Sequence, residues 1–324
     1  MTASPPVRIA ILDDYQNVAL KLADWSPLQD RAEITVFDDH LADADAVVRR
    51  LEPFEVLCVM RERTPLPRAI VENLPNLKLI VSTGARNASI DLKATLERGI
   101  PVAVTGYDST PTVEFSWALL MAAARHIPAE NAAFRAGRWQ ESIGIDLAGK
   151  TLGLLGLGKI GSRMAAIGHA FGMKTIAWSE NLTAERAGEF GTEHVSKEQL
   201  FARADFLCVH LVLSKRSRGL VGAAELALMK PGAWLINTSR GPIVQEDALI
   251  ATLQEKRIAG AAIDVYDTEP LPEEHPLRKL PNLLATPHIG YVTERMYRTF
   301  YGDTVKNIVA WLDGRDFPQA ALPR

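Results

Sequence analysis

The chain has 324 residues, of which 47% are hydrophobic and 23% charged, and its net charge at pH 7 is −3. This balance is typical of a globular protein of roughly two domains, and it lacks the basic excess of proteins that bind nucleic acids or anionic membranes. The first apolar stretch, VRIAIL, is far shorter than the ~20 residues of a membrane span. It also does not resemble a signal peptide, which predicts a cytoplasmic protein.

The first third of the chain alternates short apolar runs with helical patterns. Runs that are apolar nearly throughout are typical of strands covered on both faces, as in a parallel sheet. We expect the two cysteines, Cys58 and Cys208, to be reduced core residues of such strands. Alternation of strand and helix predicts an α/β domain. The apolar runs of this part are residues 7–12, 34–39, 55–60, 77–83 and 101–105.

A second series of apolar runs begins after Lys150. It is preceded by residues 110–139, whose pattern predicts two helices joined near Pro128. Helical segments separate the later runs, so the sequence predicts a second α/β unit in tandem with the first. These later runs are residues 151–158, 174–179, 205–211, 233–239, 259–266 and 283–288.

The segment GLGKIG, residues 156–161, matches the spacing G-x-G-x-x-G. That spacing alone is weak, but here it follows an apolar strand and opens a helix. Gly156 suits the tight turn, Gly158 lets the backbone approach a pyrophosphate, and Gly161 lets the helix pack close to the strand. The helix N-terminus offers unpaired amides to the phosphates. The segment predicts a dinucleotide site, the alternative being a strand–helix turn that only required glycine.

The next strand ends without the acid that usually holds the adenosine ribose. Ser179 stands there, and Glu180 follows it. Serine leaves room for a 2′-phosphate, whereas Glu180 would repel one, and Arg186 lies several residues further on. The sequence therefore favours NAD only slightly over NADP.

Three ionisable residues follow strands of the second unit: Arg240 after AWLINTS, Glu269 after AAIDVYDT and His288 after LLATP. In doubly wound sheets, ligands bind outside the carboxyl ends of the strands, the edge on which the glycine turn also lies. Each residue taken alone is weak evidence: a histidine after a proline at a strand end is often only part of a capped turn, and Arg240 also fits a surface residue at a strand end. Together, after a nucleotide turn, they point to a catalytic group.

The chemistry of that group is alcohol oxidation or its reverse. Oxidation of a secondary alcohol releases a hydride to nicotinamide and a proton to a base, and histidine has an unperturbed pKa near 6.5. A carboxylate such as Glu269 fixes the tautomer of the imidazole. Arg240 offers planar, bidentate donors to a substrate carboxylate and can polarise a ketone oxygen.

At this point the sequence resembles the D-isomer-specific 2-hydroxyacid dehydrogenases. The resemblance rests on GLGKIG, on NTSRG with Arg240, on DVYDTEP with Asp264 and Glu269, and on TPHIG with His288. It extends over nearly the whole chain, because VSTGARNASID, residues 81–91, is similar to the family's substrate loop.

The resemblance implies roles for individual residues. It implies catalysis by Arg240, Glu269 and His288, and a contact of Asp264 with the nicotinamide carboxamide or its ribose. It further implies a cofactor site and a substrate site. The implied cofactor residues are Gly156, Leu157, Gly158, Lys159, Ile160, Gly161, Ser179, Glu180, His210 beside the adenine, Thr238, Asp264 and Gly290. The implied substrate residues are Thr83, Gly84, Ala85, Asn87 and Arg240.

The family's fold is α/β, with two Rossmann-like doubly wound parallel-sheet domains and a cleft between them. The resemblance implies a discontinuous substrate-binding domain, residues 1–104 and 294–324, with a dinucleotide-binding domain, residues 105–293, inserted in it. The helix pair near residues 110–140 resembles the arm through which family members form homodimers.

The substrate and its direction of turnover stay open. Glyoxylate and hydroxypyruvate are small enough, 3-phosphoglycerate is a further candidate, and Glu269 argues against formate dehydrogenases, which have glutamine there. We expect no metal, nucleic acid or membrane partner. Two alternatives remain: an NAD(H)-binding regulatory scaffold of the same fold, and a related enzyme that oxidises another small anion such as phosphite.

Overall fold

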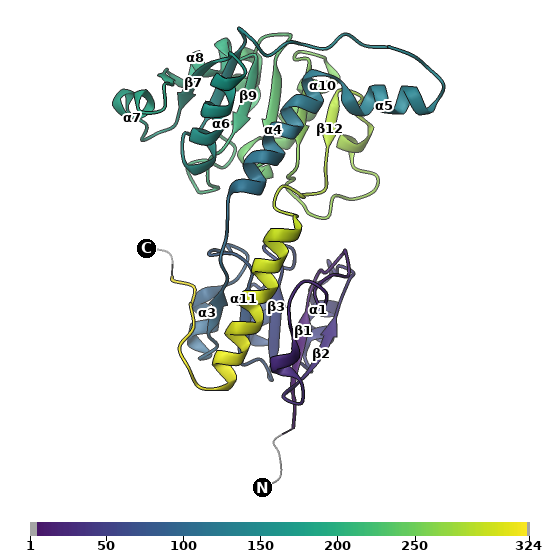
Figure 1. Ribbon diagram of the computed structural model, residues 1–324, viewed down its shortest axis with the longest axis vertical. Coiled ribbons are helices and arrows are strands. Elements are labelled where there is room, and N and C mark those ends of the chain that lie inside the picture. Colours follow the sequence, from purple (N-terminus) through teal and green to yellow (C-terminus); the bar gives the residue numbers. More distant parts are fainter. Residues whose placement is uncertain (1–4, 323–324) are drawn as a thin grey trace. The chain divides into compact units, whose positions relative to one another are not determined.

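The computed structural model describes residues 5–322 (Figure 1). Residue contacts divide the chain into two compact units: unit 1 comprises Met1–Asp108 and Val292–Arg324, and unit 2 comprises Ser109–Tyr291. Unit 2 is thus inserted in the sequence of unit 1. The boundaries expected from the sequence, after residue 104 and before residue 294, lie close to these positions, and the substrate-binding role of unit 1 stays a prediction.

Unit 1 contains a five-stranded parallel sheet in the order β2-β1-β3-β4-β5. The chain adds β2 on one side of β1 and then β3, β4 and β5 on the other side, so the sheet is doubly wound. The second strand lies earlier in the sequence than expected, because its pairing with β1 runs from Ala32 to Val36. The strands are β1 (Val7–Ile11), β2 (Ala32–Val36), β3 (Val56–Val59), β4 (Leu79–Ser82) and β5 (Val102–Val104).

The helices of unit 1 include α11 from the end of the chain. Its buried residues Phe300 and Ile308 belong to an apolar stripe that faces the sheet, and the helix lies against β4 and β5. The segment after it returns to the sheet, where Val104 N donates to Pro318 O (3.0 Å). The C-terminal segment therefore belongs to the core of unit 1. The helices are α1 (Ala44–Leu51), α2 (Arg68–Glu72), α3 (Leu92–Glu97), α11 (Glu294–Leu312) and the 3₁₀ turn η1 (Ser26–Leu28).

Unit 2 contains a seven-stranded parallel sheet in the order β12-β11-β10-β9-β6-β7-β8. The strand order reverses between β6 and β9, which makes this the switch point where doubly wound sheets bind ligands. The two parallel sheets confirm the predicted α/β fold. The strands are β6 (Thr151–Leu155), β7 (Lys174–Trp178), β8 (Glu193–His194), β9 (Phe206–Val209), β10 (Trp234–Asn237), β11 (Gly260–Ile263) and β12 (Leu283–Ala285).

Both faces of this sheet are covered, which explains why its strands are apolar throughout. Along β9, Phe206 and Cys208 join the core that α4 and α6 complete, while Leu207 and Val209 join the core completed by α8, α9 and α10. The helices of unit 2 are α4 (Thr110–Ala124), α5 (Ile127–Arg135), α6 (Lys159–Ala170), α7 (Ala184–Gly188), α8 (Lys197–Arg203), α9 (Ala223–Leu228) and α10 (Glu246–Gln254). The 3₁₀ turns are η2 (Gly241–Ile243) and η3 (Pro276–Lys279).

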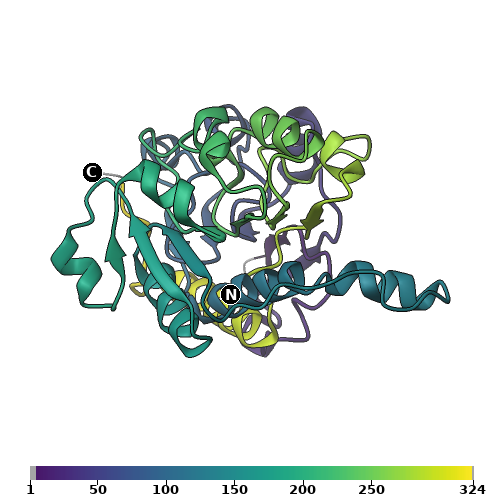
Figure 2. The ribbon, with the colours of Figure 1, turned by 90° about the horizontal axis from the view of Figure 1, so that it is seen from above.

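The predicted helix pair consists of α4 and α5. The break falls at His126, which adopts the left-handed conformation (φ 49°), and Pro128 lies in the first turn of α5. Figure 2 shows α5 and the segment that returns from it extending away from the sheet of unit 2. The returning segment is fixed at its end, where Ile145 N donates to Ala124 O (2.7 Å).

Within residues 5–322, no helix is both long enough and apolar enough to cross a membrane. In the same part of the chain, no three His, Cys, Asp or Glu side chains gather in a way that would hold a metal ion.

Candidate functional site

The glycine turn lies between β6 and α6, at the switch point of the sheet. Gly156 has φ +105°, a conformation that favours glycine. A Cβ at Gly161 would lie 2.1 Å from the carbonyl oxygen of Gly156, so the first turn of α6 can approach the strand only without a side chain there. Two of the three predicted roles thus have a direct steric basis in this turn.

Gly158 has a different role, because a Cβ there would meet nothing within 4 Å. It is the N-cap of α6, a twelve-residue helix, and being glycine it has no side chain that could accept a hydrogen bond from the first amides. The space beside Gly158 is therefore open, the first amides of a helix need acceptors, and a helix N-terminus favours an anion. These features fit the pyrophosphate of a dinucleotide.

His210 follows β9 and lies beside the glycine turn. The backbone of His210 lies so close to Gly156 that a Cβ on Gly156 would clash with the His210 carbonyl oxygen at 2.9 Å. Both ring nitrogens of His210 are buried and have no hydrogen-bond partner among the described residues. Burial lowers the pKa of His210 to about 4. An unpaired polar group in this place is consistent with a ligand that contacts it.

This burial predicts acid sensitivity of the free protein. Because the pKa of His210 is lowered in the fold to about 4, its contribution to stability is complete above pH 6.5 and is lost as the pH falls toward 4. The stability lost at pH 4 amounts to about 3 kcal/mol. Urea titrations from pH 7 to pH 4 should show that His210→Leu gains stability relative to the wild type as the pH falls. A constant difference across this range would contradict the prediction.

Ser179 and Glu180 follow β7, so they lie at the edge of the sheet that also carries the glycine turn. Ser179 is half-buried, Glu180 is exposed, and Leu182 N donates to Ser179 O (3.0 Å). Arg186 is paired with Glu189 and stacks on the ring of Phe190. Arg186, the basic residue considered for binding a 2′-phosphate, is therefore already in contact with two residues at the C-terminal end of α7.

Arg240 lies in the loop after β10, which the side chain of Asn237 shapes. The Asn237 amide nitrogen donates to Arg240 O (3.0 Å), and its oxygen accepts from Ser239 N (3.0 Å). The half-buried Arg240 side chain donates to Ser239 O (2.8 Å). The following Gly241 lies directly against the next loop, because a Cβ there would lie 2.1 Å from the carbonyl carbon of Tyr266.

Glu269 and His288 form the pair that the sequence predicted. The Glu269 Oε2 atom lies 2.6 Å from His288 Nδ1. An ionised carboxylate only accepts hydrogen bonds, so Nδ1 carries the hydrogen and Nε2 does not. Glu269 is fixed in turn, since its Oε1 accepts from Tyr266 N (2.9 Å). His288 has φ +53°, and its ring meets Tyr291 edge to face at 5.6 Å.

Asp264 holds the loop that carries His288. Its Oδ1 accepts from Thr286 Oγ1 (2.7 Å) and Ile289 N (2.8 Å), and its Oδ2 accepts from Gly290 N (2.8 Å). Burial raises the pKa of this carboxyl, while these three hydrogen bonds oppose the rise. A contact with nicotinamide, which the resemblance implies, stays a prediction for Asp264.

Thr238 and Gly290 lie close to α4. The hydroxyls of Thr238 and Ser116 are 2.6 Å apart and buried. A Cβ at Gly290 would lie 3.1 Å from Asp264 Oδ2 and 3.3 Å from the ring of Phe115. A side chain at Gly290 would thus disturb the hydrogen bonds by which Asp264 holds the His288 loop.

The predicted substrate segment of unit 1 is strongly constrained. Thr83 N donates to Val59 O (3.1 Å) and Gly84 N to Thr105 Oγ1 (2.7 Å), so both amides are already engaged. The Asn87 amide nitrogen donates to Arg61 O (2.5 Å), and its oxygen accepts from Ser89 N (2.9 Å). These contacts make Asn87 a residue that shapes the segment, and Ala85, which is exposed, lies between Gly84 and Asn87.

Arg61 lies over this segment. Its Nη1 donates to Thr83 O (3.1 Å), and a Cβ at Gly84 would lie 1.9 Å from that nitrogen. Gly84 is therefore favoured by its φ of +83°, and a side chain there would also require the Arg61 guanidinium to move.

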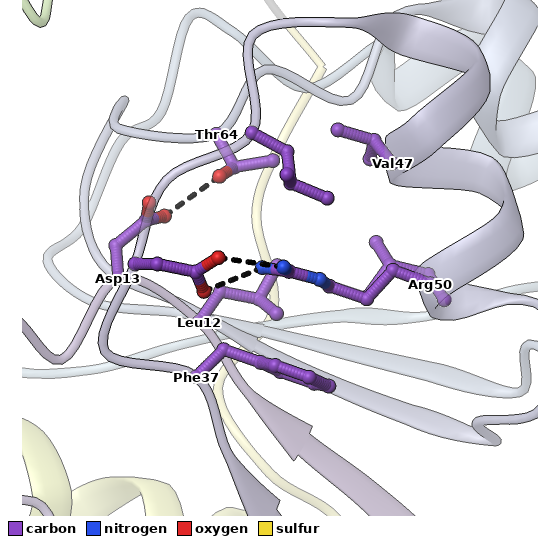
Figure 3. A pocket seen from close by; sticks show the side chains of 9 residues that line it. Leu12, Asp13, Phe37, Val47, Arg50 and Thr64 are labelled. Carbon is purple, nitrogen blue, oxygen red and sulfur yellow. Dashed lines mark hydrogen bonds and ion pairs between the residues drawn. The ribbon is translucent and has the colours of Figure 1, made fainter.

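A small cavity in unit 1 lies beside the end of β1 (Figure 3). Thr64 donates to the buried carboxylate of Asp13 (2.7 Å) on one side of it, and Arg50 pairs with Asp39 on the other (2.6 Å). The cavity measures about 10 Å³, roughly the space of one water molecule. It is too small for a substrate and belongs to the polar packing of unit 1.

The sequence did not single out Tyr266, Thr286 or Ser116, although each contacts a predicted site residue. Tyr266 and Thr286 lie inside the quoted motifs DVYDTEP and TPHIG, so their positions were visible but their contacts were not. Ser116 lies in a helix with no motif, and no sequence signal marks it.

Replacing Gly161 with alanine should weaken cofactor binding. The new methyl group would lie 2.1 Å from Gly156 O, and such overpacking costs about 1–3 kcal/mol. This cost corresponds to roughly a five- to 150-fold loss of NADH affinity in a fluorescence titration, and we also expect a lower melting temperature. Gly188→Ala is the matched control, because a Cβ in that helix meets nothing within 4 Å and should leave binding unchanged. Equal affinity in the two variants would contradict the steric argument.

Comparison with known proteins gives a consistent result. Residues 117–290 match the family model described as D-isomer specific 2-hydroxyacid dehydrogenase, NAD binding domain. The chain is 39% identical over 257 residues to a glyoxylate reductase of Thermococcus litoralis, covering 76% of this chain and 77% of that protein. It is 33% identical over 311 residues to a D-3-phosphoglycerate dehydrogenase of Methanocaldococcus jannaschii, covering 94% of this chain and 57% of the relative.

A solved structure supports the same assignment. The phosphoglycerate oxidoreductase from Vibrio cholerae o395 matches with a TM-score of 0.90 and 38% identity, over 95% of this chain and 99% of that one. The family resemblance found in the motifs is confirmed, and so is the prediction of an NAD(P)-dependent 2-hydroxyacid dehydrogenase, for which the family model indicates NAD. The chain belongs to the D-isomer specific 2-hydroxyacid dehydrogenase family.

Proposed function

We propose that the protein transfers a hydride between NAD(H) and a small D-2-hydroxy acid or its 2-oxo acid, with His288 as acid and base, Glu269 as its partner and Arg240 as the carboxylate anchor. The observation that carries this proposal is the 2.6 Å pair of Glu269 and His288. This pair follows β11 and β12, and Arg240 follows the adjacent β10, at the strand ends where the glycine turn also lies.

In this proposal, residues of the chain transfer the proton of the substrate hydroxyl and bind the substrate carboxylate. Glu269 holds the hydrogen on Nδ1 of His288, so Nε2 accepts the proton of the substrate hydroxyl or returns one to the ketone oxygen. The Arg240 guanidinium binds the carboxylate in a bidentate way and fixes the carbon that reacts. When bound, NAD supplies the acceptor or the donor of the hydride.

The residues proposed to hold NAD are those of the glycine turn, residues 156–161, with Ser179, Glu180, His210, Thr238, Asp264 and Gly290. Support comes from the open space at Gly158, the unpaired ring of His210 and the family model. We propose NAD rather than NADP as the preferred cofactor, because Glu180 would repel a 2′-phosphate and Arg186 is paired with Glu189.

We further propose that the segment from Thr83 through Gly84 and Ala85 to Asn87 contacts the substrate. Relatives named glyoxylate reductase and hydroxypyruvate reductase make glyoxylate and hydroxypyruvate the first substrates to examine. Relatives named D-3-phosphoglycerate dehydrogenase add the phosphorylated oxo acid.

The test is a screen of 2-oxo acids against both cofactors. Glyoxylate, hydroxypyruvate, pyruvate and 3-phosphohydroxypyruvate are each supplied with NADH and with NADPH, and absorbance at the nicotinamide band is followed. We expect turnover with at least one acid and a higher kcat/KM with NADH. Absence of cofactor oxidation with every acid would favour a dinucleotide-binding scaffold, and oxidation of phosphite alone would reassign the substrate.

We also propose that the protein is a homodimer formed through α5 and the segment after it. Phe134, Trp139 and Ile143 are 65%, 74% and 93% exposed, which is unusual for large apolar side chains. Phe134 and Trp139 line a hollow of about 400 Å³ on this arm. Sedimentation equilibrium would measure the mass of the assembly, and a monomer at micromolar concentration would exclude this arm as a stable interface.

A further inference from the structure

Three loops carry the candidate catalytic residues of unit 2, and Tyr266 contacts all of them. Tyr266 is 9% exposed and follows β11. Its amide, its phenol and its carbonyl each face a different loop. A residue in such a place is suited to set the distances between groups that lie far apart in the sequence.

The amide and the phenol act on the Glu269–His288 pair from both sides. The amide donates to Glu269 Oε1 (2.9 Å), which leaves Oε2 for His288. The phenol hydroxyl donates to Thr286 O (2.8 Å), two residues before His288. That same carbonyl accepts from His288 N (3.0 Å), so the phenol anchors the turn that gives His288 its left-handed backbone.

The carbonyl side of Tyr266 faces the Arg240 loop. A Cβ on Gly241 would lie 2.1 Å from the Tyr266 carbonyl carbon and 2.7 Å from Asp267 N. The peptide after Tyr266 therefore lies directly against Gly241, the residue that follows Arg240. The position of this peptide sets how closely the Arg240 loop approaches the loop of Glu269.

Burial and the charges of Asp264 and Glu269 raise the pKa of the Tyr266 phenol. The hydroxyl therefore keeps its proton at neutral pH and acts as a donor. Its acceptor, the Thr286 carbonyl, lies in the loop that Asp264 clamps from the other side.

We propose that Tyr266 is a positioning residue that holds Glu269 and His288 in register with Arg240, through its amide, its phenol hydroxyl and its carbonyl. It acts through these residues and has no assigned contact with substrate. The inference rests on the proposed function for its kinetic consequence, whereas its structural part, the placement of Glu269 and His288 relative to the Arg240 loop, does not depend on that function.

The experiment uses Tyr266→Phe, which removes the hydroxyl and keeps the ring, the amide and the carbonyl. We expect kcat with the best 2-oxo acid to fall about tenfold, because small errors in the placement of a catalytic group are costly. KM for NADH should stay within about twofold, since the glycine turn is untouched. Tyr301→Phe is the matched control: it also removes a buried tyrosine hydroxyl, one that donates to Asp14 in unit 1 (3.3 Å).

A spectroscopic readout separates positioning from general loss of stability. The chain has seven histidines, and nitrogen-15 labelling of histidine reports which ring nitrogen of each carries the hydrogen. His288 is assigned as the signal lost in His288→Gln. We expect the wild type to show the hydrogen on Nδ1, and Tyr266→Phe to shift His288 toward a mixture of both forms, while Tyr301→Phe retains the wild-type signal.

The outcomes are distinguishable. An unchanged His288 signal in Tyr266→Phe, an unchanged kcat, or an equal loss of kcat in Tyr301→Phe would overturn the inference. If the wild type reduces no 2-oxo acid, the proposed function fails, and the nitrogen signal of the free protein still decides whether Tyr266 orients His288.

Discussion

Replacing His288 with glutamine is expected to lower kcat for 2-oxo acid reduction by about 10²–10⁴-fold, the usual contribution of a positioned acid or base. The reason is that the proposed function assigns proton transfer to Nε2 of His288, whose Nδ1 lies 2.6 Å from Glu269 Oε2. KM for NADH should change little, because the glycine turn lies on a different strand. Steady-state kinetics with both substrates varied would give the two constants separately.

The matched control is His275→Gln. His275 also pairs with a carboxylate in unit 2, since its Nε2 lies 3.1 Å from Glu246 Oε1. Loss of that pair should leave kcat within about twofold of the wild type, since an exposed or partly exposed pair contributes about 0–1 kcal/mol and only to stability. If both variants lose kcat equally, the loss in His288→Gln does not support a role of His288 as the acid and base of the reaction. Unchanged kinetics in His288→Gln would remove it from the mechanism altogether.

Replacing Arg240 with glutamine is expected to lower kcat/KM for the oxo acid strongly. A charge-assisted hydrogen bond contributes about 1.5–3 kcal/mol, which corresponds to roughly a 10- to 150-fold loss. Arg240→Lys retains the charge but loses the planar bidentate fork, so it should recover only part of the activity. The measurement is kcat/KM with glyoxylate and with hydroxypyruvate.

Arg203→Gln serves as the control for Arg240. Arg203 makes a two-pronged pair with Glu193 (2.6 and 2.8 Å) on the surface of unit 2, away from the strand ends that carry the site. Its loss should not change kcat/KM. A variant of Arg240 that retains full activity would show that the substrate carboxylate is bound elsewhere and would exclude the anchor proposed here.

Asp264 and Tyr266 both act on His288, so the effects of variants at these three residues are coupled. Asp264 clamps the His288 loop with three hydrogen bonds, and Tyr266 fixes Glu269. A change at either residue therefore alters His288 indirectly, and the effects of such changes will not add to those of His288→Gln. Double variants are the appropriate way to assign a contribution to each.

The sequence by itself determined the α/β class, the glycine turn and the identity of Arg240, Glu269 and His288 as candidates. Hydrophobic period and glycine spacing are local properties, and the carboxyl ends of parallel strands share one edge, so these features follow from the order of residues. The family resemblance followed from the same motifs.

The contacts within the site were decided only by the tertiary structure. Tyr266 meets Gly241, Glu269 and the His288 loop because β10, β11 and β12 are neighbours in the sheet, and no local pattern encodes which side chain or peptide fills the space between three loops. The same holds for Gly84, whose amide is already bonded to Thr105, and for His210, whose ring nitrogens are buried without partners. Hydrogen bonding and desolvation depend on neighbours far apart in the sequence, and packing alone brings those neighbours together.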